Sequence, residues 1–116
     1  MNDRELLELA AKAAGFETIQ YKDLKAVALD VRYAIDKAIW NGEDYWNPLV
    51  DDGDALRLAV NLELPIRFAP NGTVESGNAK SGYPFWEILD NDPYAATRRA
   101  IVRAAAEIGK VKGDEK

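Results

Sequence analysis

Hydrophobic positions at the start of the chain follow the spacing of an α-helix. The apolar residues form one broad stripe that consists of Leu6, Leu7, Leu9, Ala10, Ala13 and Ala14. Asn2 or Asp3 is suited to the N-cap, where a short polar side chain accepts a hydrogen bond from a free backbone N–H. Gly15 stands where a left-handed C-cap is expected. The pattern predicts a helix that ends before Gly15, and the alternation over residues 16–21 predicts a short strand after it.

Residues 24–40 fit two different periodicities. Helical spacing selects Leu24, Ala28, Val31, Ile35 and Ala38, whereas strict alternation selects Val27, Leu29, Val31, Tyr33 and Ile35. Alanine and lysine favour a helix, while β-branched and aromatic residues favour a strand. The residues themselves leave a helix and a β-hairpin equally open for this segment.

The middle of the chain alternates between turn residues and apolar periods. We expect a loop over residues 42–54, because Asn47 precedes a proline and residues 51–54 are turn formers. A helix should follow, with Asp51 or Asp52 as its cap. Its predicted apolar stripe consists of Ala55, Leu56, Ala59, Val60 and Leu62 or Glu63. Residues 64–68 and 83–89 predict strands, and the turn-rich residues 69–82 predict a hairpin or a loop between them.

The last apolar period predicts a long helix. Asn91 or Asp92 can cap it, Pro93 suits its first turn, and we expect Gly109 to end it. The positions expected to face the core are Tyr94, Thr97, Ile101, Ala104, Ala105 and Ile108. Residues 1–110 would then form one domain, followed by a frayed charged tail at 111–116. Three helices and a short, mainly antiparallel sheet predict an α+β fold, a small layered helix–sheet–helix sandwich.

Composition removes most catalytic chemistry from consideration. The 116 residues include no His and no Cys, which excludes triad hydrolases, cysteine-based zinc or iron–sulfur sites and thiol catalysis. No pair of carboxylates has a spacing that identifies catalysis, so we expect no enzyme, no catalytic residue, no cofactor and no metal site. The N-terminus lacks an apolar signal core, and no uncharged stretch approaches the roughly 20 residues that span a bilayer. A cytoplasmic protein without membrane contact is expected.

Negative charge is concentrated in the middle of the chain. Lys and Arg number 15 and Asp and Glu number 20, so the net charge is −5. Residues 43–63 contain one base, Arg57, and six acids, which are Glu43, Asp44, Asp51, Asp52, Asp54 and Glu63. One interpretation is a docking surface for a basic protein, formed by Glu43, Asp44, Asp51 and Asp52 with Trp40 beside them. It predicts that reversing Glu43, Asp51 and Asp52 to Lys abolishes binding with little change in stability. The other interpretation is helix capping and ordinary solvation, since the contiguous acids lack the spacing of a calcium loop.

Arg98, Arg99 and Arg103 give the predicted last helix a basic side. Guanidinium groups contact phosphates or carboxylates through paired hydrogen bonds. The alternative is a solvated face, or ion pairs with acids of the same chain. The acidic overall charge argues against a general affinity for nucleic acid, which depends on Lys and Arg displacing counterions.

Two further motifs have ordinary structural interpretations. The stretch GTVESGNAKS at 72–81 has spaced glycines and a Lys-Ser pair, but two residues separate its second glycine from Lys80, unlike in a phosphate-binding loop. We expect a connecting loop there. Trp46 and Trp86 are expected in the core, and Trp40 is expected to be the most exposed of the three tryptophans.

The chain contains RELLELAAKAAG at 4–15, YWNPLVDDGDALRLAV at 45–60 and DPYAATRRAIVRAAAEIGK at 92–110. Together these segments resemble the phage ABA-sandwich family, small proteins of bacteriophages and prophages. The resemblance implies a helix–sheet–helix layering and a phage setting. It also implies an extended segment before the WNPL turn, which favours the hairpin for residues 24–40. The family has no assigned biochemical role, so the resemblance supplies no catalytic residue.

The leading hypothesis is a non-catalytic phage accessory protein that binds a host or phage protein through its acidic surface. One specific form is a host-defence inhibitor of the anti-CRISPR type, which blocks a nucleic-acid-binding defence complex. The first alternative is a nucleic-acid-associated protein that uses Arg98, Arg99 and Arg103. The second is a self-associating structural domain, in which a homodimer buries Trp40 or the last helix.

Overall fold

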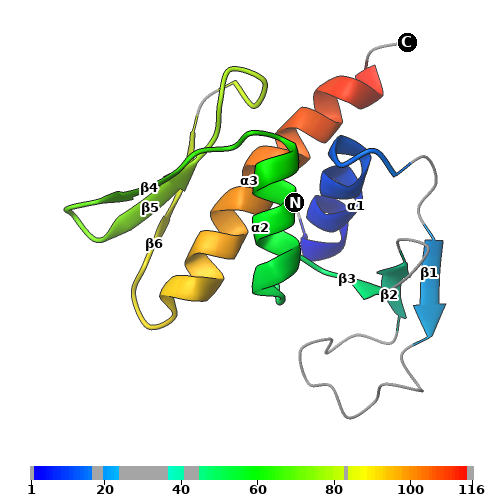
Figure 1. Ribbon diagram of the computed structural model, residues 1–116, viewed down its shortest axis with the longest axis horizontal. Coiled ribbons are helices and arrows are strands. Elements are labelled where there is room, and N and C mark those ends of the chain that lie inside the picture. Colours follow the sequence, from blue (N-terminus) through cyan, green and yellow to red (C-terminus); the bar gives the residue numbers. More distant parts are fainter. Residues whose placement is uncertain (1, 17–19, 24–36, 41–44, 83, 115–116) are drawn as a thin grey trace.

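The computed structural model describes residues 2–16, 20–23, 37–40, 45–82 and 84–114, and this part of the chain has an α+β fold. Its helices are α1 (Asp3–Ala13), α2 (Asp52–Asn61) and α3 (Pro93–Asp114). Its strands are β1 (Gln20–Asp23), β2 (Lys37–Trp40), β3 (Tyr45–Trp46), β4 (Ile66–Ala69), β5 (Thr73–Ser76) and β6 (Phe85–Ile88). The helices pack against strands of two small antiparallel sheets (Figure 1). The predicted α+β class is confirmed, with the strands divided between two sheets.

Each sheet consists of three strands that are neighbours in the chain. β2 pairs with β1 and β3, and β5 pairs with β4 and β6. Residues 37–40 of the ambiguous segment are therefore a strand, whereas residues 24–36 lie outside the described residues. The predicted loop at 42–54 is shorter than expected, because Tyr45–Trp46 pairs with β2 and α2 already begins at Asp52.

The core centres on the contact between α1 and α3. Asn2 caps α1 by accepting a hydrogen bond from the Glu5 amide at 2.8 Å, and Gly15 follows the helix with a φ of +100°, as predicted. More than half of the residues that the two helices bury are alanines, and the buried set is Leu6, Leu7, Ala10, Ala11, Ala13, Ala100, Ile101, Val102, Ala104, Ala105, Ala106 and Ile108. Small side chains at a helix contact shorten the distance between the two axes. The alanine content of both helices therefore reflects close packing.

Gly109 lies inside α3 and does not end it, which corrects the prediction. The helix continues to Asp114, so most of the expected tail is helical. A Cβ atom at position 109 would lie 1.9 Å from the backbone oxygen of Leu9 in α1. Because no side chain fits in that space, Gly109 permits the close approach of α1 to α3.

The buried face of α2 is rotated from the predicted one. Ala55, Leu58 and Ala59 are buried, whereas Leu56 and Val60 are 58% and 70% exposed. The helix carries apolar residues on more than one side, so periodicity could not identify the side that packs against α3. Among the described residues, every helix is too short or too polar to cross a bilayer.

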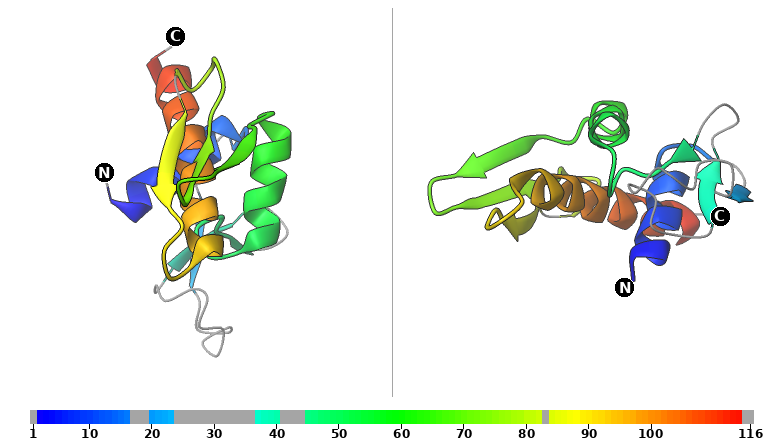
Figure 2. Two further views of the ribbon diagram at one scale, coloured as in Figure 1. Left: turned by 90° about the vertical axis from the view of Figure 1, so that its left-hand side faces the viewer. Right: turned by 90° about the horizontal axis from the view of Figure 1, so that it is seen from below.

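The sheet of β4, β5 and β6 has an inner face toward α3 and an outer face away from it. Val74 and Ser76 are buried on the inner face, where β5 contacts α3. Strand alternation and register place the residues Arg67, Ala69, Thr73, Glu75, Trp86 and Ile88 together on the opposite side, the outer sheet face. In the left panel of Figure 2 this sheet lies in front of α3. The predicted burial of Trp86 is wrong, since its side of β6 faces solvent and it is 58% exposed.

The first turn of α3 also differs from prediction. Tyr94 was expected in the core but is 69% exposed. α3 begins away from α1 (Figure 1) and reaches it from its second turn onward, where Arg99 pairs with Asp3. The apolar period therefore starts before the helix has a partner to pack against.

Candidate functional site

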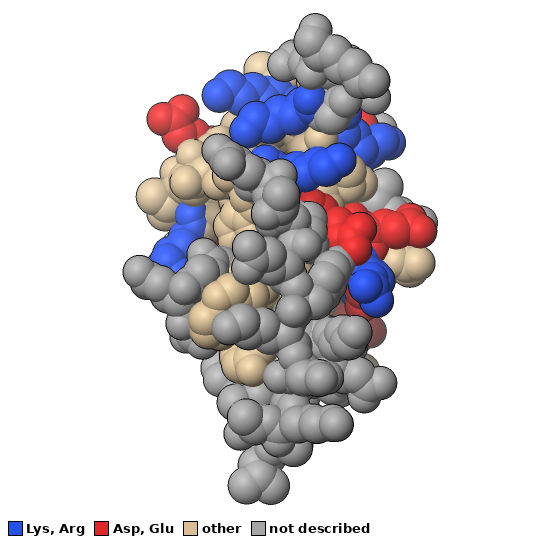
Figure 3. Space-filling model, turned by 90° about the vertical axis from the view of Figure 1, so that its right-hand side faces the viewer, with Lys and Arg blue, Asp and Glu red and all other residues tan. Residues whose placement is uncertain are grey.

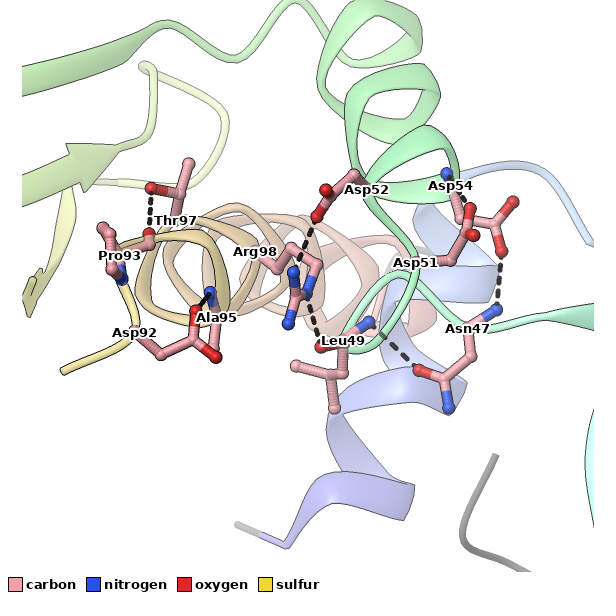
Figure 4. A network of polar contacts seen from close by, with 10 residues as sticks. All are labelled: Asn47, Leu49, Asp51, Asp52, Asp54, Asp92, Pro93, Ala95, Thr97 and Arg98. Carbon is pink, nitrogen blue, oxygen red and sulfur yellow. Dashed lines mark hydrogen bonds and ion pairs between the residues drawn. The ribbon is translucent and has the colours of Figure 1, made fainter. Parts of the chain in front are cut away.

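Three of the predicted acidic residues, Asp51, Asp52 and Asp54, lie at the N-terminus of α2 (Figure 4). Asp51 is the N-cap, and its carboxylate accepts a hydrogen bond from the Asp54 amide at 2.8 Å. The Asp54 carboxylate is buried and accepts hydrogen bonds from the Asn47 amide at 2.9 Å and from Arg57 at 2.8 Å. Asn47 Oδ1 accepts a hydrogen bond from the Leu49 amide at 3.0 Å. These contacts join the turn before α2 to the first turn of the helix.

Asp52 connects α2 to α3. Its carboxylate pairs with Arg98 at 2.6 Å, and Arg98 Nε donates to the Leu49 carbonyl at 2.8 Å. The Arg98 side chain is only 16% exposed. Asp92 caps α3 by accepting a hydrogen bond from the Ala95 amide at 3.0 Å. The N-termini of both helices are thus each stabilised by a carboxylate, and Arg98 lies between the two helices (Figure 4).

The acidic segment therefore takes part in the fold itself. Asp51 and Asp52 both have intramolecular partners, whereas Glu43 and Asp44 lie outside the described residues. Reversal of Asp51 to Lys would remove the N-cap and place a positive charge at the positive end of α2. We now expect this reversal to lower stability, contrary to the expectation from the sequence. The geometry supports the capping interpretation of this segment.

The three predicted arginines contact three different elements. Arg98 holds α2, Arg99 pairs with Asp3 of α1 at 2.9 Å, and Arg103 pairs with Glu87 of β6. A phosphate-binding surface needs its basic groups to be available together on one accessible face. The pairing of all three guanidinium groups favours the interpretation as ion pairs within the protein.

Arg103 makes two further contacts that fix β6 on α3. It donates a hydrogen bond to the Trp86 carbonyl at 3.2 Å, and its guanidinium carbon lies 5.0 Å from the centre of the Phe85 ring. Close by on the inner face, the Ser76 hydroxyl is buried and has no hydrogen-bond partner among the described residues. The contact between this sheet and α3 therefore combines paired charge with one unsatisfied polar group.

The tryptophans have three different environments. Trp46 is in the core, as predicted, and its ring centre lies 5.0 Å from that of Phe16. Trp40 is half-buried, with its ring edge-on to Tyr45 at 5.4 Å. The prediction that Trp40 is the most exposed of the three is wrong, because Trp86 on the outer sheet face is more exposed.

The outer sheet face is the surface that sequence reasoning missed. Trp86 and Ile88 are 58% and 63% exposed, and an ion pair of 2.7 Å between Arg67 and Glu75 crosses the same face. Asp90 is exposed two residues beyond Ile88, with a φ of +35°. Both faces of β6 carry a large apolar residue, so alternation alone could not show which of them faces solvent.

A cavity of about 710 Å³ opens where the ends of α1 and α2 meet the last turns of α3. Its apolar lining comes from Ala13, Leu62, Ile108 and Val111, and its charged lining residues are Lys80, Glu107 and Lys112. Ala79, Ser81 and Gly82 complete one wall.

Asn78 holds the loop that forms this wall. Its Oδ1 accepts hydrogen bonds from the Lys80 amide at 2.9 Å and the Ser81 amide at 3.2 Å. Its Nδ2 donates to the carbonyls of Leu62 at 3.1 Å and Glu63 at 3.3 Å, which follow α2. The buried Ser81 hydroxyl closes the loop by donating to the Asn78 carbonyl at 2.9 Å. The connecting loop that was expected within residues 72–81 therefore forms one wall of the cavity, and these hydrogen bonds hold it in place.

The described residues contain no group of three or more acidic side chains placed to hold a metal ion. Comparisons with protein-family models, with curated proteins and with solved structures found no match to this chain. The resemblance to the phage ABA-sandwich family stays a prediction.

Proposed function

We propose that this protein is a non-catalytic binding protein and that its partner is a protein with a positively charged surface. The observation that carries the proposal is the pair of large apolar side chains on the outer sheet face, Trp86 and Ile88, which are more than half exposed. Water contact with two such side chains is unfavourable, and a partner that covers them gains the hydrophobic free energy. Trp is also among the residues that contribute most to protein interfaces.

The charges around the outer sheet face define the partner. Arg67 and Glu75 neutralise each other there, and Asp90 adds an exposed carboxylate beside Ile88. The whole chain carries a net charge of −5, so long-range attraction favours a basic partner and opposes a second copy. We therefore expect a partner that presents an apolar pocket or side chain with Lys or Arg next to it.

A site-specific photo-crosslinker tests this surface. Benzoyl-phenylalanine replaces Trp86 in one variant and, as a matched control, the 70% exposed Val60 on α2 in another. In cells that make the protein naturally, we expect a crosslinked protein from position 86 and none from position 60. Equal capture from both positions would contradict the proposal.

The captured protein is then titrated in purified form. We expect Trp86→Ala with Ile88→Ala to weaken binding by about tenfold or more, because central aromatic residues contribute most of the binding free energy. Leu56→Ala with Val60→Ala removes two exposed apolar side chains of α2 and should leave binding unchanged. Asp90→Lys should weaken the binding of a basic partner, and the loss of affinity should be larger at low salt. If light scattering instead shows a dimer that Trp86→Ala dissociates, the partner is a second copy and the proposal fails.

The phage setting gives this proposal its specific form. If the chain is a phage accessory protein, a basic partner in the host could be a nucleic-acid-binding defence complex, which an anti-CRISPR inhibitor would block. The resemblance over three segments supports this form, and the identity of the crosslinked protein tests it. A crosslinked protein without nucleic-acid contacts would contradict the inhibitor while leaving the binding surface intact.

A further inference from the structure

We infer that the cavity between the ends of α1 and α2 and the last turns of α3 binds a small amphiphilic anion, a carboxylate with an aliphatic body. The cavity lies away from the outer sheet face, so the inference is independent of the proposed function. It depends on three properties of the lining: an apolar interior, a positive mouth and a wall that is already in place.

The interior of the cavity is apolar and comes from three helices. Ala13 ends α1, Leu62 follows α2, and Ile108 and Val111 belong to α3. Val111 is 47% exposed although it is one of the apolar lining residues. A hydrocarbon chain in this space would cover the exposed part of Val111 and gain the hydrophobic free energy of contact with all three helices.

The mouth of the cavity is positive although the protein is acidic. Lys80 and Lys112 line it, while its one acid, Glu107, pairs with Lys110 at 3.6 Å. Lys80 has no ion-pair partner among the described residues. Figure 3 shows Lys and Arg side chains gathered at the end of the molecule where α1 and α3 finish. A ligand with a negative head group therefore complements the mouth better than a cation or a neutral molecule.

The helix ends that face the cavity are already satisfied. Helix C-termini carry partial negative charge and by themselves would repel an anion. Here Lys112 Nζ lies 3.4 Å from the Ala13 carbonyl, and Asn78 donates to the Leu62 carbonyl. The backbone amides of Lys80 and Ser81 are occupied by Asn78 as well. Recognition of the anion is therefore assigned to the ammonium groups of Lys80 and Lys112.

The wall at residues 77–82 makes the cavity a preformed site. Asn78 ties the loop to the end of α2, and the Ser81 hydroxyl closes it. A wall that does not have to be ordered on binding saves the entropy that a mobile loop would lose. Medium-chain carboxylates are consequently expected to bind without a rearrangement of the fold.

Titration with two surfactant-like probes of equal chain length tests the inference. Decanoate and decyltrimethylammonium, both below their micelle concentrations, are added to the full chain at low salt and followed by two-dimensional NMR. We expect decanoate to bind saturably and to shift the amide signals of Ser81, Ile108 and Val111, and the cation to bind at least about tenfold more weakly. Equal affinity for both probes, or no saturation up to millimolar decanoate, would overturn the inference.

Charge-matched variants locate the site. Lys80→Gln with Lys112→Gln should lower the affinity for decanoate by about tenfold or more. Arg4→Gln removes a positive charge at the far end of α1 and should change this affinity by less than about twofold. Lys80→Gln alone avoids any effect on the Ala13 carbonyl and should still weaken binding severalfold. Ala79→Phe, at an exposed lining position, should block both probes. Wild-type affinity in the Lys80→Gln and Ala79→Phe variants would place the bound decanoate elsewhere and refute the site.

Discussion

The two sides of α3 are held by contacts of opposite character. Toward α1 the helix presents small residues and a glycine, and the backbones come so close that no Cβ fits at Gly109. Toward β5 and β6 it presents Arg103, with an ion pair to Glu87, and it leaves the hydroxyl of Ser76 unsatisfied. The first contact depends on shape and tolerates no added atom. The second contact depends on ion pairs and hydrogen bonds, and we expect substitution of its residues to lower the free energy of unfolding only moderately.

Gly109→Ala breaks the first contact and should have the largest effect. The added methyl group collides with the Leu9 carbonyl, so one helix must move or unfold locally. We expect a loss of about 3 kcal/mol in the free energy of unfolding, as for severe overpacking in a core. Urea denaturation followed by circular dichroism measures it.

Gly53→Ala is the matched control for this change. Position 53 is also helical, but a Cβ there meets only the ends of the Arg57 and Asp51 side chains at 3.2 Å. Since Ala is a better helix former than Gly, the variant should stay within about 0.5 kcal/mol of the wild type or gain stability. Equal losses from both substitutions would show that the α1–α3 contact is not the limiting one.

Arg103→Ala tests the second contact and should have an intermediate effect. It removes the ion pair to Glu87, the hydrogen bond to the Trp86 carbonyl and the contact with the Phe85 ring. We expect a loss of about 1–2 kcal/mol by urea denaturation. Arg67→Ala breaks an ion pair on the outer sheet face, where Arg67 is 64% exposed, and should cost less than about 0.5 kcal/mol. A larger loss from Arg67→Ala would reverse this ranking of the two faces.

Ser76→Ala should have the smallest effect of the substitutions at the two contacts. The buried hydroxyl gains no hydrogen bond on folding but loses its contact with water. Removing it should change stability by less than about 0.5 kcal/mol or raise it slightly. Thermal unfolding by calorimetry suffices, and a loss well above this value would reveal a partner of Ser76.

The features that depend on local chemistry, such as helix ends, could be predicted from the sequence. Each cap was predicted as one of two neighbouring residues, and the structure selects Asn2, Asp51 and Asp92; it also confirms the left-handed Gly15. Tertiary packing decided the rest. A glycine near the end of an apolar period, such as Gly109, resembles a helix stop. Nothing in the neighbouring sequence shows that α1 packs against this position.

The candidate surfaces were harder to predict than the helices. Acids that cap a helix and acids that attract a partner look alike in a sequence, and so do arginines with and without internal partners. Trp86 was expected in the core because it is large and apolar, but Phe85 next to it on the opposite face of β6 is also large and apolar and lies on the side toward α3. The cavity requires residues from all three helices and the loop at 77–82, and no local pattern reports such a combination.

The pairing of α1 with α3 also determines when this protein can fold. The glycine and alanine contacts join residues near positions 9 and 109, and Asp3 reaches Arg99. During synthesis, α1 emerges from the ribosome about a hundred residues before its partner, with its apolar stripe uncovered. Such long-range contacts slow folding and expose newly made chains to aggregation or chaperone capture until α3 has been made.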